Sequence, residues 1–356
     1  MNFKPKIDLK ILIPAFFLYA LGITTIYSVA PSLVNQTLLF GFLGLLFYLL
    51  FCGIDYQIYK SLSNWFYILS IIFLVLTEVV GVVTRGSVRW LDIGVIRLQP
   101  SELIKPLMLI FLATNFEKIT TLKKIFSPSV FYFIPLLLIL RQPDLGNAMV
   151  FAFVWLMIFF VSGVRRSVLL GLFAGAPAAV LVIWHFLKNY QKERIFSFLN
   201  PGSDPLGTGY NAIQSTLAVG AGQILGRGLG RGTQSHLLFL PEYHTDFIFA
   251  SFAEEWGFIG VCLLLGVYFF LLFHLFKKSE SGQDRFGQLI LLGVAGIIFI
   301  QMFVNIGMNM GMVPITGITL PLVSYGGSSL ISTAILLGIA SNITKQKSPE
   351  SSFVIS

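Results

Sequence analysis

The stretch FLPEYHTDFIFASFAEEWGF, residues 239–258, combines carboxylates with an apolar run. Asp246 stands where polar residues give way to apolar ones, and Glu254 and Glu255 lie within the apolar part. A carboxylate at such a boundary can act as a general base, because it is partly desolvated and still within reach of a hydroxyl group. The alternative is that Asp246, which follows Thr245, caps the start of a helix, a position that both residue types favour.

The neighbours of Asp246 have separate expected roles. In one continuous helix, Glu254 would lie about 12 Å deeper than Asp246, since each residue adds about 1.5 Å. Glu254 and Glu255 point to different faces, so at most one of them shares a cavity with Asp246. We therefore expect both glutamates to be structural or cavity-lining. His244 lies two residues before Asp246 and is placed to tune it.

Further ionisable residues lie within or beside apolar runs, where they are costly and often functional. Glu102 and Lys105 in QPSELIKP are three apart and predict an ion pair on one helix face. That pair either fixes helix packing or lines a cavity in which Lys105 positions a ligand phosphate. Asp144, close to Arg141, either caps a turn or binds a ligand.

The composition requires a membrane setting for these residues. Hydrophobic residues make up 56% of the chain and charged residues 11%, and the mean hydropathy is +0.83; soluble domains are about 25% charged. Apolar runs near the bilayer-spanning length of about 20 residues predict ten spans. They lie at about 10–30, 34–54, 64–84, 101–116, 128–141, 145–162, 166–187, 246–273, 286–311 and 322–343. Arg141 to Asp144 form a turn that separates the fifth and sixth spans.

The sequence thus predicts an all-α integral membrane protein with about ten transmembrane helices. Residues 1–356 are expected to form a single polytopic membrane domain. Lys and Arg concentrate in the loops that would lie on the cytoplasmic side if the N-terminus does. Both termini are therefore predicted to be cytoplasmic, including the tail at 344–356. The long loop at 188–245, between helices seven and eight, is predicted to be extracytoplasmic.

The basic residues do not predict a nucleic-acid site. The net charge of +8 comes mostly from bases interleaved with spans, which form no continuous patch. On the predicted outer side arginine dominates, and its planar guanidinium suits bidentate binding of phosphate. We infer an anionic, phosphate-bearing ligand there; solvated loop charges or contacts with lipid headgroups are the alternative. The arginines are Arg85, Arg89, Arg97, Arg141, Arg194, Arg227 and Arg231.

Absent motifs narrow the chemistry further. No Walker A sequence occurs, so no ATP site of that kind is expected. No Ser-x-x-Lys motif for penicillin-type acyl transfer and no Asp-x-Asp pair for a metal-bound nucleotide sugar is present either. The glycine-rich LGRGLGRG, residues 225–232, fails the dinucleotide pattern in every register.

Several motifs together resemble the SEDS family, the shape, elongation, division and sporulation proteins. The resemblance covers nearly the whole chain. It rests on RGSVRWLDIGVIRLQPSELIKP (85–106), RQPDLG (141–146), NPGSDPLGTGYNAIQS (200–215), GLGRGTQSHLLFLPEYHTDFIFASFAEEWGFIG (228–260) and NIGMNMGMVPITGITLPLVSYGGSS (305–329). GTQSHLLFLPEYHTDFIF and NIGMNMG are more similar to the RodA branch, which serves elongation, than to the FtsW branch, which serves division. GITLPLVSYGG is also similar to the division branch.

The resemblance implies an inverting peptidoglycan glycosyltransferase that polymerises lipid II at the outer face of the bacterial cytoplasmic membrane. It also implies a class B penicillin-binding protein, a transpeptidase, as membrane partner within the elongation or division machinery. The absence of Ser-x-x-Lys fits that division of labour. No cofactor follows from the motifs, and a divalent cation, Mg²⁺ or Mn²⁺, is a candidate without assigned ligands.

By motif, Asp246 matches the essential aspartate of the family and would be the general base. The resemblance also implies substrate-binding roles for seven residues: Arg89, Trp90, Glu102, Lys105, Arg194, Arg231 and Ser324. From their own positions Arg141, Asp144 and His244 are further candidates for binding substrate. Two other functions remain open. Polar residues within spans also suit a lipid II flippase, and a non-catalytic scaffold that activates a transpeptidase would leave Asp246 without a task.

Overall fold

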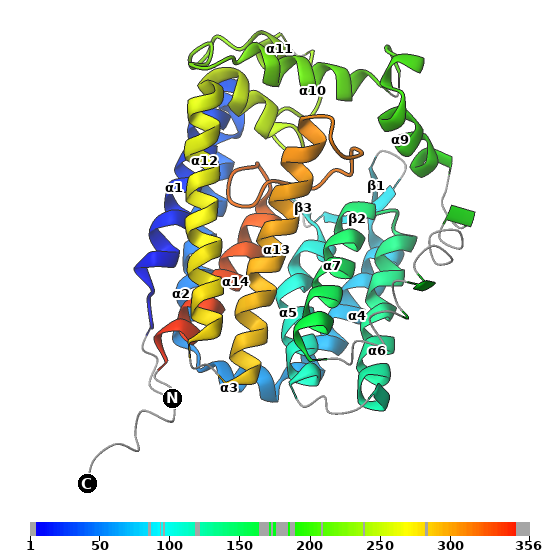
Figure 1. Cartoon of the computed structure of the whole chain (residues 1–356), viewed down its shortest axis with the longest axis vertical. Helices are drawn as coiled ribbons and strands as arrows, with labels where there is room; N and C mark the ends of the chain where they lie inside the picture. Colours follow the sequence, from blue (N-terminus) through cyan, green and yellow to red (C-terminus); the bar gives the residue numbers. More distant parts are fainter. Residues whose placement is uncertain are drawn as a thin grey trace.

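The structure is a computed structural model that describes residues 5–84, 87–92, 94, 97–117, 122–163, 171, 174–175, 184–185, 189–207, 209–237, 239–281 and 284–346 (Figure 1). Its helices are α1 (Leu9–Val29), α2 (Val34–Gly53), α3 (Tyr56–Ser61), α4 (Ser63–Val80), α5 (Pro100–Phe116), α6 (Leu122–Arg141), α7 (Leu145–Val161), α9 (Asn189–Leu199), α10 (Tyr210–Ala221), α11 (Thr233–His236), α12 (Ile248–Glu280), α13 (Arg285–Asn309) and α14 (Gly327–Lys345). Two 3-10 turns are η1 (Pro31–Leu33) and η2 (Pro201–Ser203).

The apolar runs form the predicted membrane helices. Nine of the ten expected spans coincide with α1, α2, α4, α5, α6, α7, α12, α13 and α14, and six of these helices are long and apolar enough to cross a bilayer by themselves. The expected span at 166–187 and the tail beyond residue 346 lie outside the described residues, apart from a few positions. The turn after Arg141 is confirmed, since α6 ends there and α7 begins at Leu145.

Burial separates an interior helix from lipid-type surfaces. Residues 328–344 of α14 are all buried, whereas Phe16, Trp65 and Phe269 on other helices are each 69% exposed. Large apolar side chains exposed in this way are expected where hydrocarbon replaces water. Within the bundle polar side chains join helices: the amide of Asn342 on α14 donates to the carbonyl of Cys52 on α2 at 2.7 Å.

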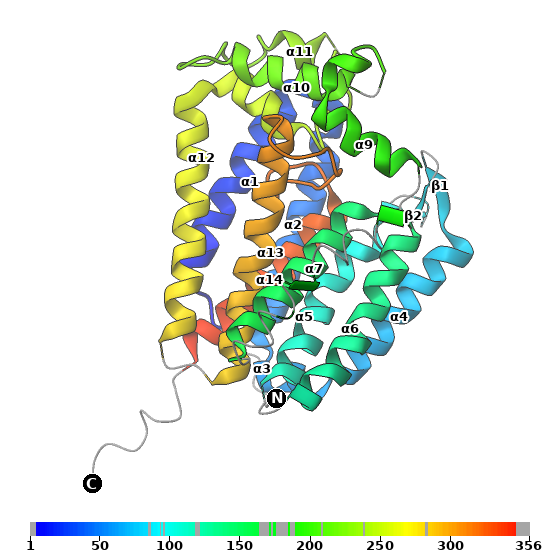
Figure 2. The same ribbon diagram turned by 45° about the vertical axis from the view of Figure 1, so that its right-hand side comes forward.

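The two ends of the bundle differ. At one end, here the terminal end, the Lys6 amine donates to the Gln346 side chain at 3.2 Å, so both ends of the described chain meet there. The opposite end, here the loop end, carries α9, α10 and α11 (Figure 1). Figure 2 shows α4, α6 and α7 grouped around α5, with α1 and α12 on the other side of the bundle.

A small sheet at the loop end was not predicted from the sequence. Strands β1 (Val82–Thr84), β2 (Ser87–Asp92) and β3 (Arg97–Leu98) pair antiparallel in that order. The expected span at 64–84 ends earlier, because α4 stops at Val80 and β1 takes the following residues. Arg89 and Trp90 therefore lie on a strand.

The long loop has the expected organisation around its centre. The stretch at 213–230 mixes apolar residues with glycines, which predicts a short interfacial helix followed by turns. Helix α10 ends at Ala221, and the residues from Gly222 to Gly232 are mostly turns, which confirms the helix and the turns.

The expected continuous span at 246–273 is wrong. Gly257 has a φ of 66° and a ψ of −167°, which break α12 into an initial part at 248–256 and a main part at 258–280. The two parts meet at the upper end of α12 in Figure 1, from which the initial part runs back into the molecule. An apolar run can contain such a reversal without any change in composition, because glycine adopts positive φ without steric penalty.

Candidate active site

Asp246 does not cap α12. The helix begins at Ile248, and the capping position is occupied by Phe247 without a side-chain hydrogen bond. The first turn is instead served from another helix, because the backbone N–H of Ala250 donates to Oδ1 of Asn309 on α13 at 3.1 Å. The helix-cap interpretation of Asp246 is therefore wrong, and its carboxylate is not used in that way.

The backbone of Asp246 is fixed from α13. Its carbonyl oxygen accepts hydrogen bonds from the side-chain amides of Asn305, at 2.9 Å, and Asn309, at 3.1 Å. The two asparagines are four residues apart and so share a face of the helix, and both are fully buried. The Asn305 amide also donates to the carbonyl of Ile318 at 2.6 Å. This bond joins the loop at 311–326 to the same pair of side chains, Asn305 and Asn309, here called the asparagine clamp.

The residues before Asp246 are fixed from that loop. Ser324 donates its hydroxyl hydrogen to the carbonyl oxygen of Thr245 at 2.8 Å and accepts from the backbone N–H of Leu320 at 2.8 Å. The backbone N–H of Tyr325 donates to the carbonyl of His244 at 2.9 Å. Ser324, predicted to bind substrate, thus has its oxygen engaged in holding the chain next to Asp246.

The carboxylate of Asp246 lies against Gly317. A Cβ atom added to Gly317 would be 3.4 Å from Oδ2 of Asp246, and the φ of Gly317 is +76°. Asp246 itself is partly exposed. The carboxylate therefore has a defined position beside the loop at 311–326 and still has access to the outside of the protein.

His244 lies beside Asp246 in sequence and between two tyrosines in space. Its ring centroid is 5.1 Å from that of Tyr243 and 5.6 Å from that of Tyr325. The Tyr325 hydroxyl donates to the side chain of Gln36 at 2.6 Å, and burial raises the pKa of this hydroxyl. The effect of His244 on Asp246 stays a prediction.

The ion pair predicted on α5 is confirmed. The Nζ atom of Lys105 is 2.6 Å from Oε1 of Glu102, and both side chains are buried. Both residues belong to the first two turns of α5, the turns nearest the loop end.

Asp144 holds the starts of two helices together. It caps α7, where its Oδ1 accepts from the backbone N–H of Asn147 at 3.2 Å. Its Oδ2 accepts from Gln99 and Ser101 at the start of α5, both at 2.8 Å. The expected turn cap is confirmed. Arg141 lies elsewhere: its Nε is 3.5 Å from Oε1 of Glu78, a residue for which the sequence suggested no partner.

Three helix starts meet the loop that contacts Asp246. The backbone N–H of Gln99, which precedes α5, donates to Ser328 in the first turn of α14 at 2.9 Å. In the first turn of α7, Gly146 packs so closely that an added Cβ would be 2.6 Å from the side chain of Ile318. Helix N-termini carry partial positive charge. Asp144 already caps α7, so the starts of α5 and α14 are the ones that favour an anion in this part of the loop end.

The predicted arginines do not converge on one point. Arg89 and Trp90 are on β2. Arg194 on α9 donates to the carbonyl of Ile315 at 3.1 Å and borders a mostly apolar cavity of about 330 Å³ between α9, α10 and the end of α13. Arg231 is exposed in the turn-rich stretch after α10. Their roles in binding substrate stay predictions.

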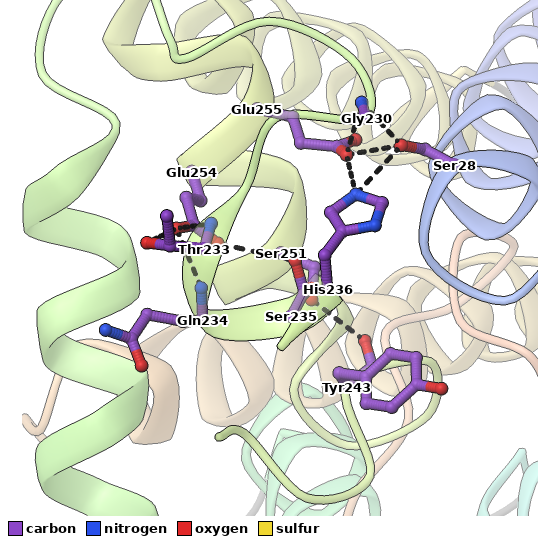
Figure 3. Close-up of polar contacts among 10 residues, drawn as sticks. All are labelled: Ser28, Gly230, Thr233, Gln234, Ser235, His236, Tyr243, Ser251, Glu254 and Glu255. Atoms are coloured by element: carbon purple, nitrogen blue, oxygen red, sulfur yellow. Dashed lines mark hydrogen bonds and ion pairs between the residues drawn. The ribbon is translucent and has the colours of Figure 1, made fainter. Parts of the chain in front are cut away.

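Glu254 and Glu255 do not lie deeper than Asp246. The two depths can be compared along helix α1. Glu255 bonds to Ser28 of α1, near the loop end. Val323, which precedes Ser324, contacts Gly22 of α1. Six helical residues separate Gly22 from Ser28, or about 9 Å. Glu255 is therefore nearer the loop end than the segment that holds Asp246. The reversal at Gly257 is the cause, and both carboxylates face the stretch after α10 (Figure 3).

Sequence reasoning missed the asparagine clamp. Asn305 and Asn309 belong to NIGMNMG, a motif noted without a role for either residue. Two buried amides four residues apart in an apolar helix are the signal that could have identified them, because polar groups within spans need partners. Their partner, a backbone carbonyl 59 or 63 residues away, has no signature in the sequence.

No metal site follows from the geometry. Across the described ranges, no three His, Cys, Asp or Glu side chains are grouped so that they could hold an ion. The suggested Mg²⁺ or Mn²⁺ therefore has no fitting protein ligand set in that part of the chain, and no chemical step is assigned to it.

Comparisons with known proteins agree with the motif resemblance. The sequence profile of the FtsW/RodA/SpoVE family, described as "cell cycle protein", matches residues 6–349. The chain is 40% identical over 306 residues to the peptidoglycan glycosyltransferase MrdB of Escherichia coli K12, covering 85% of this chain and 82% of MrdB. It is 35% identical over 362 residues to stage V sporulation protein E of Bacillus subtilis, covering 96% and 98% of the two chains.

A solved structure supports the fold. The chain superposes with a TM-score of 0.82 on one chain of a solved peptidoglycan synthase complex. That structure is described as showing the structural coordination of polymerization and crosslinking. The identity is 34%, and the match covers 95% of this chain and 97% of the other.

Proposed function

Because the chain belongs to the FtsW/RodA/SpoVE family of cell cycle proteins and is a peptidoglycan glycosyltransferase like its relative MrdB, we propose that it polymerises lipid II into glycan strands with Asp246 as the general base. The observation that carries this proposal is the fixed position of Asp246. Two asparagine amides hold its backbone, Ser324 holds the preceding residue, and its partly exposed carboxylate lies beside Gly317.

In the proposed reaction the 4-hydroxyl of the acceptor GlcNAc attacks C1 of the donor MurNAc. Asp246 takes the hydroxyl proton as the new O–C1 bond forms, because a neutral hydroxyl is a weak nucleophile. The bond from C1 to the pyrophosphate oxygen breaks on the opposite face, so the configuration at C1 inverts. Undecaprenyl pyrophosphate leaves with the electron pair of that bond.

The leaving group needs positive charge near the departing oxygen. The starts of α5 and α14 supply backbone dipoles, and neither helix has a side-chain hydrogen bond at its cap. Lys105 supplies a full charge beside Glu102. We assign pyrophosphate binding to this group, with Arg89, Trp90, Arg141, Arg194 and Arg231 as surrounding substrate contacts. Asp144 and Ser324 position helices and chain around it.

The setting of the reaction follows from the same assignment. We place the loop end outside the cytoplasmic membrane, and the terminal end with both termini in the cytoplasm. The predicted outer arginines lie in the outer loops, and most lysines lie in the segments predicted to be cytoplasmic. A class B penicillin-binding protein is the proposed partner, because no Ser-x-x-Lys motif for crosslinking occurs in this chain. The sequences of several motifs, which are more similar to the RodA branch, favour a role in elongation over a role in division.

The test is lipid II polymerisation by the purified protein together with its transpeptidase. We expect Asp246→Ala and Asp246→Asn to abolish glycan strands while both variants remain folded. Full polymer yield from Asp246→Ala would remove the general-base role. If the wild type transferred lipid II across liposome membranes and made no polymer, the protein would be a flippase and not a polymerase.

A further inference from the structure

The stretch at 222–236, here called the collar, runs against the initial part of α12. The backbone N–H groups of Arg227 and Gly228 donate to the carbonyls of Glu254 and Glu255 at 2.9 and 3.0 Å. Beyond the reversal the backbone N–H of Phe258 donates to the carbonyl of Gln223 at 2.8 Å. These bonds join the collar to both sides of Gly257.

Glycines make this backbone contact possible. A Cβ on Gly226 would be 2.1 Å from the carbonyl oxygen of Glu255, and one on Gly222 would be 1.9 Å from that of Ala253. Either side chain would force the two segments apart. The glycine-rich stretch that resembled a dinucleotide motif thus serves the fit of the collar to α12.

Glu254 fixes the collar from one side. Its Oε1 accepts from the backbone N–H groups of Thr233, at 2.7 Å, and Gln234, at 3.1 Å, and from the Thr233 hydroxyl at 3.1 Å. Its Oε2 accepts from the Ser235 hydroxyl at 3.3 Å. Figure 3 shows this carboxylate facing the start of α11. The side chain of Glu254 is fully buried.

Glu255 fixes the collar to α1 as well. Its Oε1 accepts from the backbone N–H of Gly230 at 3.1 Å and from the hydroxyl of Ser28, and it lies 3.1 Å from Nε2 of His236 (Figure 3). His236 uses the same nitrogen toward Ser28, at 3.4 Å. A catalytic triad would use both ring nitrogens, one for the acid and one for the hydroxyl. The group is therefore a structural connection of three segments.

The initial part of α12 connects these contacts to Asp246. It has nine residues, about 13 Å at about 1.5 Å per residue. One end follows Asp246 and is held by Asn305, Asn309 and Ser324. The other end carries Glu254 and Glu255. A rigid segment held at one end only can tilt, so its direction depends on the contacts at the other.

We propose that Glu254 and Glu255 are positioning residues for catalysis: they bind the collar to the initial part of α12 and thereby set the position of the Asp246 carboxylate. This inference rests on the proposed role of Asp246 as general base. Burying two carboxylates is costly, and both carboxylates spend their hydrogen bonds on joining the collar to α12.

The test measures steady-state polymerisation of lipid II by the complex with its transpeptidase. We expect Glu254→Ala to lower kcat by about 10- to 100-fold, since a displacement of about 1 Å can cost about 100-fold. The KM for lipid II should change less than kcat, because all proposed substrate contacts except Arg231 lie outside the collar. Glu254→Gln preserves an acceptor in place and should retain most of the kcat.

A second measurement detects the collar directly. Arg227 and Arg231 are exposed within it, so trypsin should cleave there faster in Glu254→Ala than in the wild type, at a temperature well below the unfolding midpoints of both proteins. The matched control is Glu193→Ala, which removes an exposed glutamate of α9; it should change neither kcat nor cleavage. Wild-type kcat and wild-type cleavage in Glu254→Ala would overturn the inference.

Two further variants keep the test decisive. If Glu254→Ala does not fold, His236→Ala removes one contact of Glu255 without deleting a carboxylate and should combine lower kcat with faster cleavage of the collar. Unchanged values for His236→Ala would then count against the inference. Asp246→Ala is measured in parallel: an inactive Asp246→Ala beside a fully active Glu254→Ala refutes only the positioning role. An active Asp246→Ala refutes the general base itself.

Discussion

The side-chain amide of Asn305 donates a 2.9 Å hydrogen bond to the backbone carbonyl of Asp246. This bond joins the end of a buried apolar helix to the residue proposed as the base. The bond positions Asp246 through its backbone carbonyl.

Asn305→Ala should lower kcat by about tenfold or more, because Asp246 loses one of two amide donors and a small displacement of a base is costly. Steady-state polymerisation of lipid II measures this change. Asn115→Ala is the control, since the Asn115 amide donates to the carbonyl of Phe111 within its own helix, α5, at 2.8 Å. Equal kcat for both variants would contradict the clamp.

Gly317→Ala should lower polymerisation at a modest cost in stability. Its φ of +76° costs a side chain about 1–2 kcal/mol, and the added Cβ would fill the space beside Oδ2 of Asp246, 3.4 Å away. Gly163→Ala is the matched control, with a φ of +77° and nothing within 4 Å. The thermal unfolding midpoint should fall equally in both variants, and polymerisation activity should fall only in Gly317→Ala. Activity in both would show that the contact with Asp246 is unimportant.

Lys105→Met should destabilise the protein by about 3–5 kcal/mol, because Glu102 is then left buried without its partner. The double variant Glu102→Gln, Lys105→Met should recover much of that stability, since no charge stays unpaired. It should not recover polymerisation if Lys105 binds pyrophosphate. Unfolding midpoints and product yield, measured on the same preparations, separate the two roles. A stable and active double variant would leave the pair with a structural role only.

Asp144→Ala should lower stability strongly, because it leaves the donors of Gln99, Ser101 and Asn147 without their acceptor, at about 1–3 kcal/mol for each buried group. Asp284→Ala is the comparison. It removes the cap of α13, whose oxygen accepts from the N–H of Gly287 at 2.9 Å, and should cost about 1 kcal/mol. Thermal unfolding in detergent measures both, and similar shifts would contradict a central role of Asp144.

The sequence sufficed for the features that depend on local pattern. Apolar runs of bilayer length predicted nine of the described helices, and the spacing of Glu102 and Lys105 predicted their ion pair. The cap by Asp144 follows from its place before an apolar run. Each of these depends on neighbours within a few residues, and for those neighbours the helical repeat fixes distance.

The other features depend on contacts between distant segments. The clamp of Asn305 and Asn309 needs the carbonyl of Asp246, which carries no side-chain signal. The reversal at Gly257 occurs inside a run that is uniformly apolar, and a glycine in such a run is usually compatible with a helix. The error about Glu254 and Glu255 followed directly, since residue number was converted to depth along a helix that does not continue.

The reversal at Gly257 also constrains length. The residues between Asp246 and Gly257 form a strut between the base and the rim of the loop end, and each residue contributes about 1.5 Å to its height. Insertion or deletion of one residue there would rotate the strut by about 100° and shift one end against the other, even if every side chain were retained. The number of residues in this segment therefore matters to the site as much as the two carboxylates near its end.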